Sequence, residues 1–218
     1  MTELLIKASL SYLLGSIVGS LLLGRLRGGI DIRRLGSGNA GGTNALRTQG
    51  KSFASCVLLI DIGKGWVATR IIAPLALPGV GLASPEADAW LPAACGIAVM
   101  LGHVYPVWYE FRGGKGVATL VGAVLGLAPW LLVPMLCAWL AAMILVGFVG
   151  LASMLGAVAL TVAIAWSGLE PRIPLLSFGG VAALLIVYTH RSNIARMRAG
   201  IEPRARRLWL FGCGRERM

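Results

Sequence analysis

The stretch from Val117 to Phe148 reads VATLVGAVLGLAPWLLVPMLCAWLAAMILVGF and contains no charged residue. A helix that spans a membrane needs about 20 mostly apolar residues, so this stretch is long for a single span. Proline interrupts helical hydrogen bonding, and Pro129 and Pro134 lie near the middle of the stretch. We therefore predict two spanning helices here, at Val117–Leu132 and Val133–Phe148.

Other apolar runs lie on both sides of this stretch. They are Leu4–Leu23, Phe53–Ile72, Trp90–Trp108, Met154–Trp166 and Leu175–Tyr188. Together the runs predict an all-α membrane protein with about seven transmembrane helices. The run Met154–Trp166 is short for a span, which leaves six helices as the alternative. No small-residue cleavage site follows Leu4–Leu23, so we expect a first span there and not a signal peptide.

The overall composition also indicates a membrane protein. Of the 218 residues, 57% are hydrophobic and 13% are charged, and the mean hydropathy is +0.79. A soluble domain usually carries roughly a quarter charged residues. Seven spans leave no room for a separate soluble domain, so we expect residues 1–218 to form one integral membrane domain.

The cysteines are scattered along the chain and form no CxxC pair. They are Cys56, Cys95, Cys137 and Cys213, and most of them lie within apolar runs. This pattern is typical of small buried side chains and not of a disulfide or zinc framework. We expect no metal site and no cofactor.

The basic residues predict the orientation in the membrane, because Lys and Arg accumulate in cytoplasmic loops. The first loop, the third loop and the C-terminal tail are basic, whereas the second loop, Ala73–Ala89, has no Lys or Arg. With seven spans these segments alternate consistently, with the N-terminus outside and the C-terminus in the cytoplasm. Six spans would place the Arg-rich tail on the opposite side from the first loop.

The net charge of +11 raises the question of nucleic acid binding. The basic residues, however, lie beside apolar runs and are not interleaved with aromatic residues that could stack on bases. We therefore expect contacts with anionic lipid head groups and no nucleic acid partner.

The first loop contains LGSGNAGGTNALR from Leu35 to Arg47. Glycine lets backbone N–H groups converge on an anion, and Arg47 and Lys51 supply positive charge. Thr43 or Asn44 is expected to cap a helix that runs through Arg47. The segment is a candidate phosphate cradle; the alternative is a flexible surface loop.

The third loop contains a second glycine-rich basic segment, FRGGKGV from Phe111 to Val117. A Gly-Gly-Lys-Gly sequence entering a helix can offer amides and one ammonium group to a phosphate. The GxxxxGK[ST] spacing is absent, so the segment does not predict ATP binding. Two such loops on one membrane face strengthen the interpretation as anion sites.

Other polar residues lie within or beside apolar runs. His190 and Asn193 follow the last run and would share one face of a continuing helix; the alternative for His190 is an interfacial polar residue. Asp61 and Lys64 lie inside an apolar run, and either an internal ion pair or substrate contact explains them. For His103 we expect a packing or interface role, and the alternative is a catalytic one. Neither histidine begins an HxxxxD pattern.

These segments resemble the bacterial acyl-phosphate-dependent glycerol-3-phosphate acyltransferases along essentially the whole chain. The matching motifs are GSGNAGGTNALRTQGK from Gly36, DIGKG from Asp61, GHVYPVW from Gly102, RGGKGVAT from Arg112 and HRSNIARMRAGIEP from His190. The chain departs from the family pattern at Ala40-Gly41-Gly42, where Pro-Gly-Ala is usual. It also lacks the first of two serines before the sixth span and keeps Ser153.

The resemblance implies transfer of a fatty acyl group from acyl phosphate to the 1-hydroxyl of glycerol 3-phosphate, the first step of phospholipid synthesis. The products would be lysophosphatidic acid and phosphate. It implies a bacterial inner membrane protein whose active site faces the cytoplasm. The expected partners are acyl phosphate, glycerol 3-phosphate and membrane lipids, with functional coupling to an acyl-phosphate synthase.

The resemblance also assigns candidate site residues. The candidate catalytic residues are Ser37, Arg47, Lys115, His190 and Asn193. The candidates for binding substrate or phosphate are Gly38, Asn39, Gly41, Thr43, Asn44, Gly113, Gly114, Gly116, Ser153 and Glu202. Glu202 is alternatively a structural residue.

Two phosphate substrates explain two basic loops, because an acyl phosphate is already activated and needs mainly proximity and charge neutralisation. We expect Lys115 and Arg47 to stabilise the departing phosphate and the developing oxyanion. The hydroxyl proton goes either to His190 or to a substrate phosphate oxygen. The rival hypothesis is a transporter of organic phosphates, but transporters usually place their polar site at the midplane, often with repeat symmetry.

Overall fold

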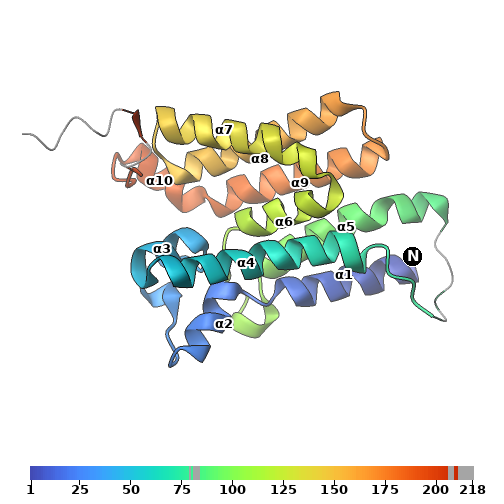
Figure 1. The fold of residues 1–218 in the computed structure, drawn as a ribbon, viewed down its shortest axis with the longest axis horizontal. Helices are drawn as coiled ribbons and strands as arrows, with labels where there is room; N and C mark the ends of the chain where they lie inside the picture. The colour runs from blue at the N-terminus through green and yellow to red at the C-terminus, as the bar shows by residue number, and fades with distance from the viewer. Residues whose placement is uncertain (79, 81–83, 206–208, 211–218) are drawn as a thin grey trace, which may run out of the picture. The chain divides into compact units, whose positions relative to one another are not determined.

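The computed structural model describes residues 1–78, 80, 84–205 and 209–210, and these residues are helical with no β-strand (Figure 1). The elements are α1 (Thr2–Gly15), α2 (Gly19–Leu26), η1 (Ile32–Arg34), α3 (Gly42–Gln49), α4 (Lys51–Val67), η2 (Ala68–Ile72), α5 (Pro85–Val104), η3 (Val107–Tyr109), α6 (Val117–Leu127), η4 (Pro129–Leu131), α7 (Leu132–Leu145), α8 (Val149–Ser167), α9 (Arg172–Thr189) and α10 (Arg191–Arg198). The chain divides into two compact units, Met1–Pro129 and Trp130–Met218.

In the first unit, α1 packs against α5 and α4 packs against α6 (Figure 1). Glycine permits the close approach at both contacts. A Cβ atom at Gly15 would lie 2.2 Å from the Val99 carbonyl oxygen, and one at Gly122 would lie 1.9 Å from that of Ile62. Such small-residue contacts are typical of helices that pack within membranes.

In the second unit, α8 packs against both α7 and α9, and α10 contacts α8 and α9. Ala142, Met143 and Ala152 form the buried core between α7 and α8. The segment after α10 returns to this core, where the Ala205 N–H donates to the Gly147 carbonyl at 2.8 Å. Ala205 is thereby fixed to the α7–α8 turn.

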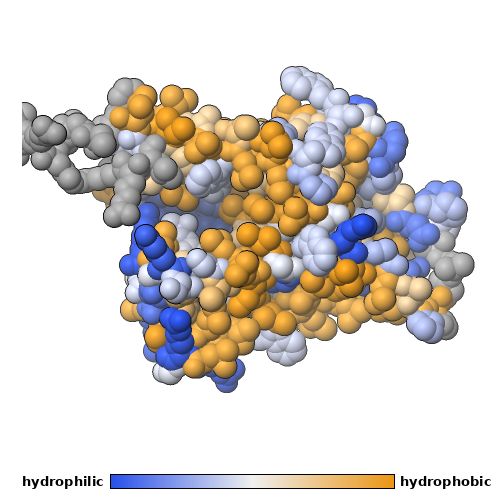
Figure 2. Space-filling model, viewed as in Figure 1, coloured by the Kyte–Doolittle hydropathy of each residue, from blue (hydrophilic) through white to orange (hydrophobic). Residues whose placement is uncertain are grey.

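The outer surface is rich in large apolar side chains (Figure 2). Leu59 and Leu184 are each 72% exposed, and Trp166 is 87% exposed. Soluble monomers rarely expose contiguous apolar surface of this kind, whereas lipid covers it in a membrane. Hydrophilic residues gather over α2 and α3, at one end of the first unit.

Each of the predicted apolar runs coincides with helix, although the boundaries differ. Among the residues that the structure describes, three helices have the length and composition of a membrane span: Pro85–Tyr109, Val149–Ser167 and Arg172–Thr189. The pair α1 and α2, bent by 47°, would be a fourth, while Val117–Leu127 and Pro129–Leu145 are shorter apolar helices. The prediction of seven spans therefore stays a prediction.

The predicted continuous run Leu4–Leu23 is broken in the structure. α1 ends at Gly15 and α2 begins at Gly19, with a bend of 47° between them. The predicted boundary at Leu132–Val133 also moves, because α6 already ends at Leu127 and Pro129 begins a short 3-10 turn. Proline lacks the N–H that would continue the helix.

Candidate active site

Asn44 organises the first glycine-rich loop. It is buried in the first turns of α3, and its Nδ2 donates to the carbonyls of Ile32, Leu35 and Asn39 at 3.1, 2.9 and 3.0 Å. Its Oδ1 accepts the N–H of Ser37 at 2.9 Å. One side chain thus fixes the loop that carries the predicted anion site.

The prediction that Thr43 or Asn44 caps this helix is wrong. The N-cap is Gly41, and no side chain caps the helix. The Asn44 amide turns back onto the preceding loop instead, where several carbonyls compete for its two donor hydrogens. Gly36 makes room for it, because a Cβ atom there would lie 2.3 Å from Oδ1 of Asn44, and φ at Gly36 is +57°.

The other candidates of the first loop surround this buried asparagine. Ser37, Gly38, Thr43 and Arg47 are exposed, while Asn39 and Gly41 are half-buried. The structure therefore brings these candidates together on one loop and the helix that follows it. The hydroxyls and the guanidinium group lie on the surface, where a soluble phosphate can reach them.

The second glycine-rich loop packs onto the end of α5. The Gly113 N–H donates to the Val104 carbonyl at 3.0 Å, and the Gly114 N–H donates to the His103 carbonyl at 3.1 Å. These two amides are therefore engaged within the protein. Gly116 follows with φ of +87° and is the N-cap of α6, whose first-turn N–H groups have no acceptor inside the helix. Lys115 is half-buried between these groups.

Arg33 joins the two glycine-rich loops. Its Nη1 donates to the carbonyls of Tyr109 and Arg112 at 2.9 and 3.2 Å. Its Nη2 lies 2.9 Å from Oδ2 of Asp31, and the hydrogen bond from Arg33 holds the pKa of the Asp31 carboxyl below its ordinary value. Sequence reasoning counted Arg33 only toward the membrane orientation, because nothing in its neighbourhood indicated a partner far along the chain.

Asp61 and Lys64 form a buried ion pair that bridges the break between α1 and α2. The Lys64 ammonium lies 3.0 Å from Oδ1 of Asp61 and donates to the carbonyls of Gly15 and Ile17, both at 2.8 Å. Oδ1 of Asp61 accepts the Gly19 N–H at 3.1 Å. A positive group thus meets the C-terminal end of α1 and a negative group the N-terminal end of α2, as the helix dipoles favour.

His103 completes this buried cluster. Its Nδ1 lies 2.9 Å from Nζ of Lys64 and 3.4 Å from Oδ1 of Asp61. An ammonium group can only donate, so the shorter contact makes Nδ1 an acceptor and leaves the proton on Nε2. The packing role predicted for His103 agrees with this burial.

In the second unit, His190 lies at the junction of two helices and not within a continuing one. α9 ends at Thr189, α10 begins at Arg191, and His190 itself has φ of −92° and ψ of 9°. Its Nδ1 lies 2.7 Å from the Ile186 carbonyl. A carbonyl only accepts, so Nδ1 donates, and Nε2 is the basic nitrogen of the neutral ring.

Asn193 and Glu202 are hydrogen-bonded to each other. Nδ2 of Asn193 lies 2.5 Å from Oε1 of Glu202, and Nε of Arg196 lies 2.6 Å from Oε2. Glu202 thereby ties the segment after α10 back to that helix. A Cβ atom at Gly150 would lie 2.9 Å from Cβ of Asn193, so the start of α8 also packs here. Ser153, on the same helix, is buried and donates to the Val149 carbonyl at 2.9 Å.

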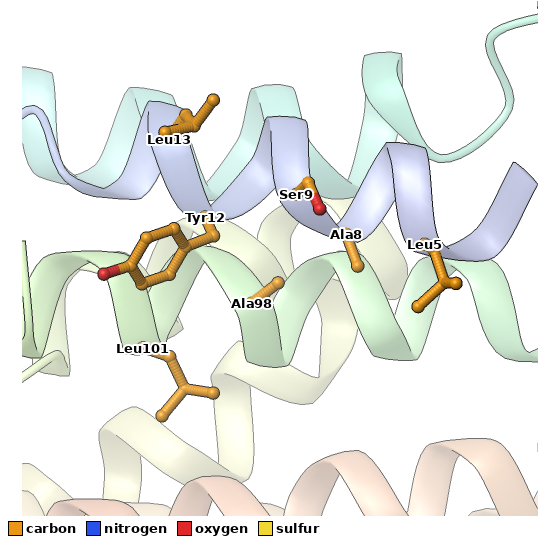
Figure 3. Close-up of a pocket in the computed structure, with 7 residues that line it drawn as sticks. All are labelled: Leu5, Ala8, Ser9, Tyr12, Leu13, Ala98 and Leu101. Carbon is orange, nitrogen blue, oxygen red and sulfur yellow. The ribbon is translucent and has the colours of Figure 1, made fainter. Parts of the chain in front are cut away.

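An apolar groove is lined by residues of α1 and α5 (Figure 3). Its volume is about 460 Å³, and Leu5, Leu13 and Leu101 are among its lining residues. Ser9 and Tyr12 are its polar members, and no charged side chain lines it. Its chemistry suits a hydrocarbon chain and not a phosphate.

Metal ligands do not gather in the part of the chain that the structure describes: it holds no group of three or more His, Cys, Asp or Glu side chains placed for a metal ion. Cys56, Cys95 and Cys137 are free thiols there, and Cys213 lies outside the described residues.

Comparison with known proteins gives consistent matches. The family model of glycerol-3-phosphate acyltransferase matches residues 5–200. A glycerol-3-phosphate acyltransferase of Synechococcus elongatus is 42% identical over 197 residues, which are 90% of this chain and 92% of that protein. One of Chlorobaculum tepidum is 39% identical over an alignment 222 residues long, which covers 89% of this chain and 93% of that protein.

Two crystal structures are also similar. Both are of PlsY (YgiH), an integral membrane glycerol 3-phosphate acyltransferase. The glycerol 3-phosphate form is 35% identical with a TM-score of 0.78, and the lysophosphatidic acid form is 33% identical with a TM-score of 0.79. Each match covers 92% of this chain and 94% of the other.

Proposed function

The chain belongs to the glycerol-3-phosphate acyltransferase family of integral membrane enzymes, and we propose that its acyl donor is acyl phosphate. The acyl group is transferred to the 1-hydroxyl of glycerol 3-phosphate, which gives lysophosphatidic acid and inorganic phosphate. The proposed acceptor and product are supported by the two similar PlsY structures, one of a glycerol 3-phosphate form and one of a lysophosphatidic acid form.

The choice of donor is supported by the charge and arrangement of the glycine-rich loops. Acyl phosphate brings a second anionic group to the reaction and leaves as phosphate, so the site needs cations for two phosphates. The loops supply Arg47 and Lys115, and Arg33 links the two loops through the carbonyls of Tyr109 and Arg112. Acyl phosphate is a mixed anhydride, so the protein needs no covalent nucleophile.

In the proposed step, the 1-hydroxyl oxygen of glycerol 3-phosphate attacks the acyl carbonyl carbon. A new C–O bond forms, the bond from that carbon to the bridging phosphate oxygen breaks, and phosphate leaves. Lys115 and Arg47 neutralise the charge that develops on the carbonyl oxygen and on the departing phosphate. Ser37 is exposed on the loop that precedes α3, and its hydroxyl group orients one phosphate.

The proton of the attacking hydroxyl goes to Nε2 of His190 or to a phosphate oxygen. The hydrogen bond from Nδ1 of His190 to the Ile186 carbonyl favours His190, because it leaves Nε2 as the basic nitrogen. Asn193 lies near the start of the helix that follows His190 and orients the acceptor. Its bond to Glu202 fixes the Asn193 amide, which supports a structural role for Glu202.

The remaining candidates divide between contact with phosphate and support of the loops. We assign phosphate contact to Gly38, Asn39, Gly41, Thr43 and Gly116, and also to Ser153 if its hydroxyl exchanges the hydrogen bond to the Val149 carbonyl for one to phosphate. Asn44, Gly113 and Gly114 support the loops, because the Asn44 amide and the N–H groups of the two glycines are engaged within the protein.

The proposal extends to the setting of the enzyme. One integral membrane domain of seven spans lies in the bacterial inner membrane, with the N-terminus outside and the site on the cytoplasmic face. A site on the cytoplasmic face allows functional coupling to an acyl-phosphate synthase on the same side of the membrane. The positive-inside distribution of Lys and Arg supports this orientation.

The test uses purified protein in lipid, supplied with glycerol 3-phosphate and either acyl phosphate or acyl-CoA. We expect lysophosphatidic acid from acyl phosphate alone, with one phosphate released for each lipid formed. Lys115→Ala should lower kcat by about 100-fold or more, whereas Arg70→Ala, which removes an exposed cation on η2, should not. Product from acyl-CoA alone would overturn the proposed donor.

A further inference from the structure

His103 is buried at the end of α5 and touches the loop that carries Lys115. The residue is 2% exposed. Its backbone carbonyl accepts the Gly114 N–H at 3.1 Å, and the next carbonyl, of Val104, accepts the Gly113 N–H at 3.0 Å. The contact between α5 and the loop therefore involves the residue directly before Lys115.

The two glycines are shaped to fit this histidine. A Cβ atom at Gly113 would lie 1.9 Å from the His103 carbonyl oxygen, and one at Gly114 would lie 2.2 Å from Nε2 of the ring. No larger residue fits at either position unless His103 moves. The Gly-Gly sequence is thus explained by close packing on the histidine, apart from any contact with phosphate.

The ring of His103 is itself held from its other side. Nζ of Lys64 lies 2.9 Å from Nδ1 and is fixed by the carbonyls of Gly15 and Ile17 and by Asp61. Asp61 and Lys64 are 1% and 4% exposed. A chain of buried contacts therefore runs from the α1–α2 break, through Lys64 and the imidazole, to Gly114.

We propose that His103 is a positioning residue, which sets Lys115 for acyl transfer through the Gly113-Gly114 backbone while Asp61 and Lys64 fix its ring. The inference rests on the proposed role of Lys115 in neutralising phosphate charge. His103 has no contact with substrate in this account. Its contribution is to hold the ammonium-bearing loop in one place, since a shift of about 1 Å can cost 100-fold in rate.

The test compares His103→Asn, Lys115→Ala and the double variant, with kcat and KM corrected for the folded fraction. The asparagine amide can still accept from Lys64, but it leaves the space beside Gly114 empty. We expect His103→Asn to lower kcat about 10- to 100-fold, with a smaller change in KM for glycerol 3-phosphate. In the Lys115→Ala background the same substitution should change kcat by less than about twofold, because the group that it positions is gone.

Lys7→Met is the matched control for lost stability. Lys7 is buried in the same unit, pairs with Glu3 at 2.6 Å and donates to the Ala73 carbonyl at 2.7 Å, so it repeats the chemistry of Lys64 away from the loop. We expect it to lower the unfolding temperature and to leave kcat of the folded protein unchanged. If His103→Asn does not fold, His103→Gln, whose amide lies farther along the side chain than Nδ1 and so no longer places an acceptor at the position that Lys64 contacts, replaces it in the same comparison.

The outcomes separate the inference from the proposed function. Full activity of Lys115→Ala would overturn the role of Lys115 and this inference with it. Loss of activity in Lys115→Ala, together with an unchanged kcat in the histidine variant or with fully additive effects, would overturn the inference alone. A decrease in kcat of Lys7→Met equal to that of His103→Asn would also overturn it, because destabilisation would then be sufficient.

Discussion

Asn44 has more hydrogen-bond partners than any sequence pattern predicted. Four backbone groups of the first loop depend on its side-chain amide. We predict that Asn44→Ala lowers the free energy of unfolding by about 2–4 kcal/mol, because buried polar groups lose their partners. Chemical unfolding in detergent measures this. Thr43→Ala, at an exposed neighbour, should cost less than about 0.5 kcal/mol; equal losses in the two variants would contradict the role of Asn44.

Asp31 and Arg33 give the loop contact a pH dependence. Arg33 lowers the pKa of Asp31 from its ordinary value of 3.8, so the ion pair contributes stability above that pH and loses it as the pH falls through the folded-state pKa. We predict that Arg33→Gln costs a constant amount of unfolding free energy above about pH 5 and less below about pH 4. Thermal unfolding across this range measures it. A cost that grows as the pH falls would contradict the assignment.

The sequence predicted the two glycine-rich loops as candidate anion sites, but it did not predict the hydrogen bonds that hold their residues in place. The composition of the first loop indicated an anion site, and Ser37, Thr43 and Arg47 do lie exposed on it. The engagement of Gly113 and Gly114 by α5 carbonyls could not be predicted, because their partners lie about ten residues earlier along a separate element. A glycine in the sequence indicates that another part of the chain can pack closely against it, but it does not indicate which part.

At the scale of elements, hydrophobic runs predicted helices well because lipid leaves the backbone no other partners. The break after Ala128 was indicated by Pro129. The break at residues 16–18 carried no such signal, since the run from Leu4 to Leu23 contains no proline and is apolar apart from Lys7 and small or hydroxyl-bearing residues. The backbone groups that lose their helical partners at this break are hydrogen-bonded by Asp61 and Lys64 on α4. Only the folded structure reveals this contact.

The contacts at the break between α1 and α2 predict that stability depends on which of the two positions, 61 or 64, carries the negative charge. Asp61→Asn should lower the free energy of unfolding by about 3–5 kcal/mol, because it leaves a buried ammonium group without its carboxylate. Exchanging the pair, as Asp61→Lys with Lys64→Asp, should not restore stability. The carbonyls of Gly15 and Ile17 need a donor, and the Gly19 N–H needs an acceptor. Unfolding measurements that show full recovery in the exchanged variant would contradict this account.

At the scale of the whole molecule, motif order and composition were sufficient to predict a helical membrane enzyme and its family. The joining of the two glycine-rich loops was not predictable, because Arg33 reaches carbonyls that are 76 and 79 residues away. Backbone carbonyls carry no sequence identity, so no residue pattern marks them as partners. The candidate site residues of the first and second units were assigned to one active site by family resemblance, because their spacing in the sequence does not predict it.

The proposed orientation predicts which loops a membrane-impermeant thiol reagent can reach in intact cells. In a variant whose native cysteines are replaced, Glu86→Cys should react, because the second loop is expected outside. Gln49→Cys, at the end of α3, should react only after the membrane is opened. Labelling of both positions in intact cells, or the reverse pattern, would contradict the orientation.

The most direct test of the central claim follows the fate of the bridging oxygen of acyl phosphate. Purified protein receives glycerol 3-phosphate and a donor labelled at that oxygen with a heavy isotope, and mass spectrometry analyses the lipid and the phosphate. Direct acyl transfer predicts that all the label leaves in inorganic phosphate, with an equal amount of lysophosphatidic acid and no acyl group left on the protein. Label retained in the lipid, or an acylated protein formed without glycerol 3-phosphate, would contradict the account.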